Sequence, residues 1–198
     1  MGHREDLLAG AQRCLLEKGF ARTTARDIVA ASGTNLASIG YHYGSKEALL
    51  VEAYVQAIKE WDTGLPSAVA GAAAEPAADP LDRFEAVWKR IIEVFPANRR
   101  LWALSSEITA QADRLPEVRA ALARAQPEGW AGLVALFHGV DESTVDEKAA
   151  RTLGTFYAAL LNGVMMQYLF DPESAPTARE LAEAMRTVAA DIGVAGGR

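Results

Sequence analysis

The residues best suited to a specific chemical task lie in a short segment near the N-terminus. Residues 35–42 follow a Ser32-Gly33-Thr34 corner and carry an amide, small side chains, a hydroxyl and two polar aromatic rings. Ser38 can donate or accept a hydrogen bond at a base edge, and Leu36 or Ala37 can meet a thymine methyl group. Small side chains also let a helix approach bases closely. This segment therefore predicts a surface that reads double-stranded DNA in the major groove.

Two short helices must position this surface. Thr24 has the side chain of a helix N-cap and begins the first helix, which ends at Gly33. Asn35 caps the second helix, expected over about 36–41. Glycine supplies the left-handed backbone that such a tight corner needs. The arrangement predicts a helix-turn-helix, in which the second helix enters the major groove.

Residues at the edges of the same surface are expected to contact phosphates. Tyr41, His42 and Lys46 have side chains that can bind phosphate oxygens, and the amides at helix starts can do the same. The expected DNA-contacting residues are Thr24, Arg26, Asn35, Leu36, Ala37, Ser38, Tyr41, His42 and Lys46.

The charge distribution separates this region from the rest of the chain. The formal net charge is −6, but residues 1–50 carry a net +1 and residues 51–198 carry −7. An acidic body is repelled by phosphates, so non-specific coating of DNA is disfavoured and contact is confined to the N-terminal face.

The chain as a whole predicts an all-α protein of about nine helices. Good helix formers dominate, and no period-2 run of β-branched residues indicates a strand. We expect a helix-turn-helix domain over 1–47 and a helical ligand-binding and dimerisation domain over 48–198. Within the second domain, the alanine-rich stretch 67–78 is expected to be a loop with frayed helical turns, and Pro127 to kink or divide its helix.

Several motifs together resemble the DNA-binding domain of TetR-family repressors. They are Gly19-Phe20, Thr23-Thr24-Ala25-Arg26-Asp27-Ile28-Val29, Ala31-Ser32-Gly33 and residues 38–50, SIGYHYGSKEALL. The resemblance covers about the first quarter of the chain. It implies a homodimer, a ligand pocket in the C-terminal domain, and repression that a small molecule relieves.

The sequence departs from the family pattern at Gly40. Many family members have an aromatic residue there that touches the DNA backbone, a contact that glycine lacks. Either Tyr41 and His42 replace this contact, or the helix end lies closer to the phosphates.

The resemblance also implies a cavity among the helices after residue 80. The expected ligand-binding residues are Trp88, Ile92, Phe95, Trp102, Ile108, Trp130, Phe137, Phe156, Tyr157 and Leu160. The alternative is that each of these side chains fills an ordinary core.

Two apolar stripes near the C-terminus predict a dimer interface. Two such helices from each protomer would form a four-helix interface around a two-fold axis, which a palindromic operator requires. The expected interface residues are Leu153, Leu161, Val164, Met165, Tyr168, Leu181, Met185, Val188 and Ile192. Alternatively, both stripes pack within one chain.

Other classes of protein find little support in the sequence. It holds no paired Glu-x-x-His motif, no GxSxG, no GxGxxG and no phosphate-binding GxxxxGK[ST], so neither an enzyme nor a cofactor is expected. A single cysteine and the absence of a signal peptide or membrane-spanning stretch favour a cytoplasmic protein without membrane contact. The remaining alternatives are a constitutive DNA-binding regulator without effector, and a small-molecule-binding helical bundle or enzyme.

Overall fold

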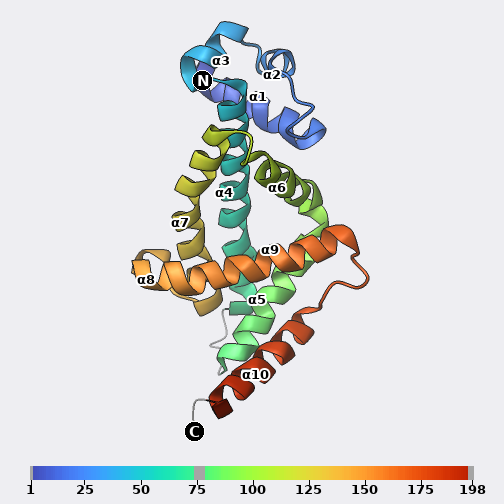
Figure 1. The fold of residues 1–198 in the computed structure, drawn as a ribbon, viewed down its shortest axis with the longest axis vertical. Helices are drawn as coiled ribbons and strands as arrows, with labels where there is room; N and C mark the ends of the chain where they lie inside the picture. Colours follow the sequence, from blue (N-terminus) through green and yellow to red (C-terminus); the bar gives the residue numbers. More distant parts are fainter. Residues whose placement is uncertain (1, 74–78, 196–198) are drawn as a thin grey trace. The chain divides into compact units, whose positions relative to one another are not determined.

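The computed structural model describes residues 2–73 and 79–195, and these ranges contain ten α-helical segments and no strand (Figure 1). This confirms the all-α fold with an N-terminal helix-turn-helix. The helices are α1 (His3–Lys18), α2 (Ala25–Ser32), α3 (Leu36–Tyr43), α4 (Lys46–Ala73), α5 (Pro80–Val94), α6 (Arg99–Gln111), α7 (Pro116–His138), α8 (Glu147–Ala149), α9 (Thr155–Phe170) and α10 (Ala178–Ala195).

Two helices can be compared with the sequence-based expectation. The loop expected over 67–78 is wrong for 67–73, because α4 continues to Ala73. Alanine is the strongest helix former, so this composition extends the helix. The rest of that predicted loop, 74–78, lies outside the described residues. Helix α7 runs through Pro127 as a single element, so the expected division is wrong, and the expected kink stays a prediction.

The contacts within the chain define two compact units. One holds the residues up to Asp62 together with Arg99–Pro127, and the other holds Thr63–Asn98 and the residues from Glu128 onward. The boundary therefore cuts α4 after Asp62 and α7 after Pro127, so two helices run from one unit into the other.

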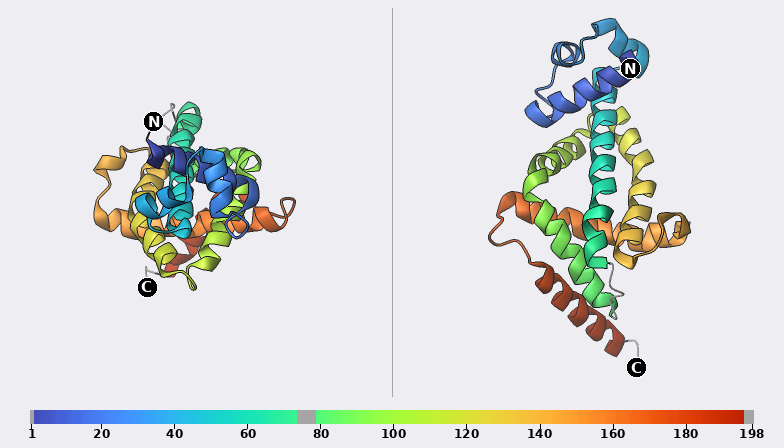
Figure 2. Two further views of the ribbon diagram at one scale, coloured as in Figure 1. Left: turned by 90° about the horizontal axis from the view of Figure 1, so that it is seen from above. Right: turned by 180° about the vertical axis from the view of Figure 1, so that it is seen from behind.

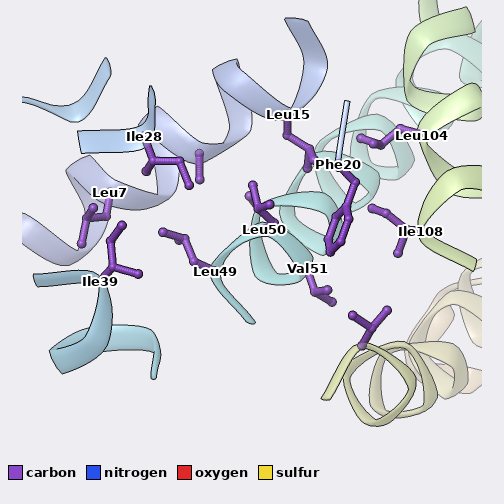
Figure 3. Close-up of a cluster of buried hydrophobic side chains, with 13 residues drawn as sticks. Leu7, Leu15, Phe20, Ile28, Ile39, Leu49, Leu50, Val51, Leu104 and Ile108 are labelled. Carbon is purple, nitrogen blue, oxygen red and sulfur yellow. The ribbon is translucent and has the colours of Figure 1, made fainter. Parts of the chain in front are cut away.

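The core of the first unit joins the helix-turn-helix to later parts of the chain. Leu7 and Leu15 of α1 pack in the same cluster as Ile28 of α2, Ile39 of α3 and Leu50 of α4 (Figure 3). Leu104 and Ile108 of α6 and Val118 of α7 complete this cluster. Burial of apolar surface therefore stabilises α1–α3 against α4, α6 and α7.

The second unit is built around aromatic rings. Trp88 of α5 is fully buried between Phe84 and Phe137, and Phe137 stacks on Tyr157 of α9 with ring centroids 4.2 Å apart. Helix α10 packs along α5 (Figure 2). The helical turn over Ala150–Gly154 is wound as a π-helix, and Gly154 touches the backbone of Trp130 closely enough to leave no room for a side chain. No helix in the described ranges has the length and apolar character needed to cross a membrane.

Candidate nucleic-acid interface

Helix α2 is fixed at its start by a reciprocal set of hydrogen bonds. The backbone N–H of Asp27 donates to Oγ1 of Thr24 at 3.2 Å, and the Asp27 carboxylate accepts from the Thr24 backbone N–H at 2.9 Å. Lys18 of α1 also donates to this carboxylate at 2.6 Å. The hydrogen bond from Lys18, followed by those from Thr24, lowers the pKa of Asp27 well below its usual value. The carboxylate thus ties α2 to α1.

Helix α3 presents one face to solvent and one to the core. Ile39 is buried, whereas Leu36 is 53% and Tyr41 86% exposed. Ala37 and Gly40 are exposed as well. Positions four apart share a helix face, so these four residues form a continuous surface, the α3 face.

Three of the expected DNA contacts have roles within the fold. Asn35 accepts the Ser38 backbone N–H at Oδ1 (3.1 Å) and so caps α3, as Thr24 caps α2. Lys46 donates to the Thr23 carbonyl oxygen at 3.1 Å and lies 3.3 Å from the Glu47 carboxylate. These side chains position the α3 face, and their contact with DNA stays a prediction.

Of the remaining candidates, Arg26, Leu36, Ala37 and Tyr41 are exposed, whereas Ser38 and His42 are partly buried. The rings of Tyr41 and His42 meet edge to face with centroids 4.8 Å apart. The neighbouring Tyr43 is different, because its hydroxyl donates to the Arg4 carbonyl oxygen at 2.7 Å and burial raises its pKa. Tyr43 therefore holds α3 against the N-terminal end of α1.

Sequence reasoning missed one residue that positions this surface. Glu107 of α6 accepts the backbone N–H groups of Phe20 and Ala21, at 3.0 and 2.8 Å. It also lines a surface groove of about 320 Å³ that reaches the loop between α1 and α2. No local pattern signals this role, because the two partners are 86 and 87 positions away in the sequence.

The expected ligand-binding residues fall into both units. Trp102 and Ile108 belong to the first unit, where Ile108 is part of the core cluster and Trp102 packs edge to face on Trp61. The other eight belong to the second unit, where Trp88, Phe95 and Phe137 are buried. Phe156 is 44% exposed, and Ile92, Trp130, Tyr157 and Leu160 are partly buried.

Trp88 stands out among them. Its side chain is fully buried, yet its indole Nε1 has no hydrogen-bond acceptor within the described residues. A buried donor without an acceptor is unfavourable and calls for an explanation.

The residues expected at the dimer interface differ in how far their own chain buries them. Leu161, Val164 and Met165 are buried by their own chain, so they stabilise the protomer instead of presenting a surface. Tyr168, Leu181 and Met185 are partly buried, whereas Leu153, Val188 and Ile192 are exposed.

The opposite side of α9 carries an exposed apolar row that sequence reasoning did not assign to the interface. Phe156, Ala159, Gly163, Met166 and Phe170 are exposed and follow one another at spacings of three and four, and we call this row the α9 face. This is the spacing by which two helices pack against each other.

The capped helix pair with its exposed second helix defines a helix-turn-helix DNA-binding protein. Residues 7–53 match the family described as "Bacterial regulatory proteins, tetR family", and residues 79–191 match "Tetracyclin repressor-like, C-terminal domain". The chain belongs to the TetR family and is a DNA-binding transcriptional regulator, in a family of non-enzymatic proteins.

Solved structures of similar proteins support this assignment. The putative transcriptional regulator SCO7518 from Streptomyces coelicolor A3(2) is 25% identical, with a TM-score of 0.67 over 94% of this chain and 97% of that one. The multidrug binding protein EbrR, complexed with proflavin, is also 25% identical, with a TM-score of 0.63 over 94% of this chain and 99% of its own.

A similarity to a repressor is confined to the N-terminal region. The HTH-type transcriptional repressor AcnR of Corynebacterium efficiens is 38% identical over 48 residues. That match spans 24% of this chain and 26% of the repressor.

Proposed function

We propose that the protein is a repressor that binds a palindromic operator as a homodimer and is released by a small, largely apolar molecule. The observation that supports a ligand site is the indole N–H of Trp88. It is fully buried in an aromatic cluster, and it has no hydrogen-bond acceptor in the described residues. We divide the roles between an N-terminal DNA-binding domain over 1–47 and a ligand-binding and dimerisation domain over 48–198, in a cytoplasmic protein.

The α3 face supplies the base contacts. Leu36 and Ala37 of this face, and the partly buried Ser38 beside them, lie in the first turns of α3, and the N-terminal residues of a recognition helix are those that meet base edges. Tyr41 and His42, near the other end of α3, supply phosphate contacts, as does Arg26 from α2. These side chains are positioned by Thr24 and Asn35, which cap α2 and α3, and by Lys46, which donates a hydrogen bond to the Thr23 carbonyl oxygen.

The α9 face supplies the dimer contact, together with Val188 and Ile192 of α10. Phe170 is 92% and Met166 52% exposed, which is unusual for large apolar side chains of an isolated protomer. Gly163 lies in the middle of the α9 face, where an added Cβ would meet no atom of its own chain within 4 Å. A second copy of the same helix can therefore approach closely around a two-fold axis.

The aromatic cluster around Trp88 is the proposed effector site, with Ile92, Phe95, Trp130, Phe137, Tyr157 and Leu160 as further candidates. Phe156 is 44% exposed and is assigned to the α9 face instead. A planar apolar molecule can stack among these rings, and one with a hydrogen-bond acceptor would satisfy Trp88 Nε1. The similar protein EbrR binds proflavin, a planar aromatic dye, which makes proflavin a suitable first probe. Trp102 and Ile108 belong to the first unit and are not assigned to this site.

Release of DNA requires that the effector prefer one of two conformations. Helices α4 and α7 run from one unit into the other, so a change around Trp88 can pass along them to the recognition helices. A differential affinity of a few kcal/mol between the two conformations is enough to release the operator.

The test is a titration of the purified protein with proflavin, followed by fluorescence, in the wild type and in Trp88→Phe. We expect saturable binding in the wild type and a loss of about tenfold in the variant, since a phenyl ring offers less surface for stacking than an indole ring. Val134→Ala, which truncates a buried side chain of α7, controls for general loosening of the second unit. Equal binding by Trp88→Phe and wild type would contradict the assignment of Trp88, and no release of DNA by any planar aromatic probe would favour a constitutive regulator.

A further inference from the structure

Gly40 occupies a position where the fold does not require glycine. It lies inside α3, and its φ angle is not positive. A Cβ built on it would meet no atom within 4 Å. An alanine side chain would therefore fit the protein at this point.

Other glycines of the chain show what a structural requirement looks like. A Cβ on Gly10 would lie 2.8 Å from the Ser32 Cβ, where α1 crosses α2. Gly33 and Gly44 have φ angles of +67° and +80°, which other residues rarely adopt. Neither a close contact nor a positive φ angle requires glycine at position 40, and glycine weakens a helix relative to alanine.

The surroundings of Gly40 indicate what its missing side chain permits. Gly40 lies on the exposed α3 face, one turn from the proposed base contacts Leu36 and Ala37 and next to the proposed phosphate contact Tyr41. A helix with its side chains is about 10–12 Å across, and the major groove is about 12 Å wide. A side chain between the base-contacting and phosphate-contacting positions would therefore hold the helix away from the DNA.

We propose that Gly40 sets how deeply α3 enters the major groove, by letting the backbone of α3 lie against the DNA between Leu36 and Tyr41. This inference rests on operator binding by the α3 face and names the residue that sets its depth.

The test compares Gly40→Ala and Gly40→Tyr with the matched control Gly129→Ala. Gly129 is also an exposed glycine inside a helix, α7, with no atom within 4 Å of an added Cβ. The DNA probe is a duplex that the wild type selects from a randomised library, and binding is measured by fluorescence anisotropy beside thermal unfolding.

We expect both alanine variants to raise the melting temperature by about 2–4 °C, because alanine favours the helix. Gly40→Ala should bind the selected duplex at least about tenfold more weakly and Gly40→Tyr more weakly still, whereas Gly129→Ala should bind as the wild type does. Gain of stability with loss of affinity is a combination that a purely structural glycine would not give.

Three results would overturn the proposal. Wild-type affinity in Gly40→Ala or Gly40→Tyr would show that depth in the groove does not depend on position 40. A lower melting temperature in Gly40→Ala would show that the fold needs this glycine after all. A wild-type protein that selects no duplex would contradict operator binding itself, and the role of Gly40 with it.

Discussion

The carboxylate of Glu107 accepts the backbone N–H of Phe20 at 3.0 Å, although the two residues are 87 positions apart. The second carboxylate oxygen accepts the N–H of Ala21 at 2.8 Å. The loop between α1 and α2 is therefore anchored to α6, a helix outside the three that form the DNA-binding motif. The hydroxyl of the buried Thr23 secures the same loop by donating to the Gly19 carbonyl oxygen at 2.7 Å.

Removing this anchor should destabilise the first unit. In Glu107→Ala, two backbone N–H groups lose a charged acceptor, which costs about 1–3 kcal/mol of unfolding free energy. Glu52→Ala, at an exposed position of α4 in the same unit, serves as the control and should change little. Urea unfolding measures both, and hydrogen exchange at Phe20 and Ala21 should speed up only in Glu107→Ala. Equal stability of the two variants would show that the anchor contributes nothing.

The hydrogen bonds to Asp27 predict a loss of stability in acid. Because the pKa of Asp27 is lower in the folded than in the unfolded chain, its contribution is present above the unfolded pKa, about 3.9, and is lost as the pH falls through the folded value. The difference in unfolding free energy between wild type and Asp27→Asn should therefore narrow as the pH falls below about 4.

The cause of the shift can be tested separately. Lys18 is the first contributor to the lowered pKa of Asp27, through a hydrogen bond of 2.6 Å. Lys18→Met should therefore raise the pKa of Asp27, as followed by NMR titration of its carboxyl carbon. A pKa that stays the same in this variant would assign the shift to Thr24 alone.

The α9 face predicts the oligomeric state. A glutamate at the exposed position 166 would place two charges beside a two-fold axis, so Met166→Glu should shift the protein from dimer to monomer. Ala123→Glu adds the same charge to an exposed position of α7 and should leave the dimer intact. Light scattering after size-exclusion chromatography reports the mass. A dimeric Met166→Glu would place the interface elsewhere.

Gly154 should be required for the fold in the way that Gly40 is not. A Cβ at position 154 would lie 2.5 Å from the Trp130 carbonyl oxygen, a backbone atom that cannot turn aside. Gly154→Ala should therefore lower the unfolding free energy by about 1–3 kcal/mol, as overpacking does. Urea unfolding of this variant beside Gly129→Ala checks the prediction, which fails if both variants are equally stable.

Local patterns in the sequence predicted the DNA-binding motif, but they could not predict contacts between residues far apart in the sequence. Thr24, Gly33 and Asn35 act within three or four residues of themselves, so their capping and turn roles can be seen in the sequence. The Glu107 anchor depends on how α6 packs against α1, which no local pattern encodes. Helix α9 is apolar on two sides, so its periodicity did not distinguish Leu161 and Val164, which face the core, from Met166 and Phe170, which do not.

Binding of a selected operator duplex, followed by fluorescence anisotropy across a salt series, tests the central claim most directly. We expect saturable binding of two protomers to one palindromic duplex, with half-sites about 34 Å apart or slightly more and an affinity that falls steeply with salt. Tyr41→Ala should weaken this binding, since an exposed phosphate contact is lost while the core is kept. Binding with no preference for the selected sequence, or equal binding by Tyr41→Ala, would contradict the assignment of the α3 face as the DNA-reading surface.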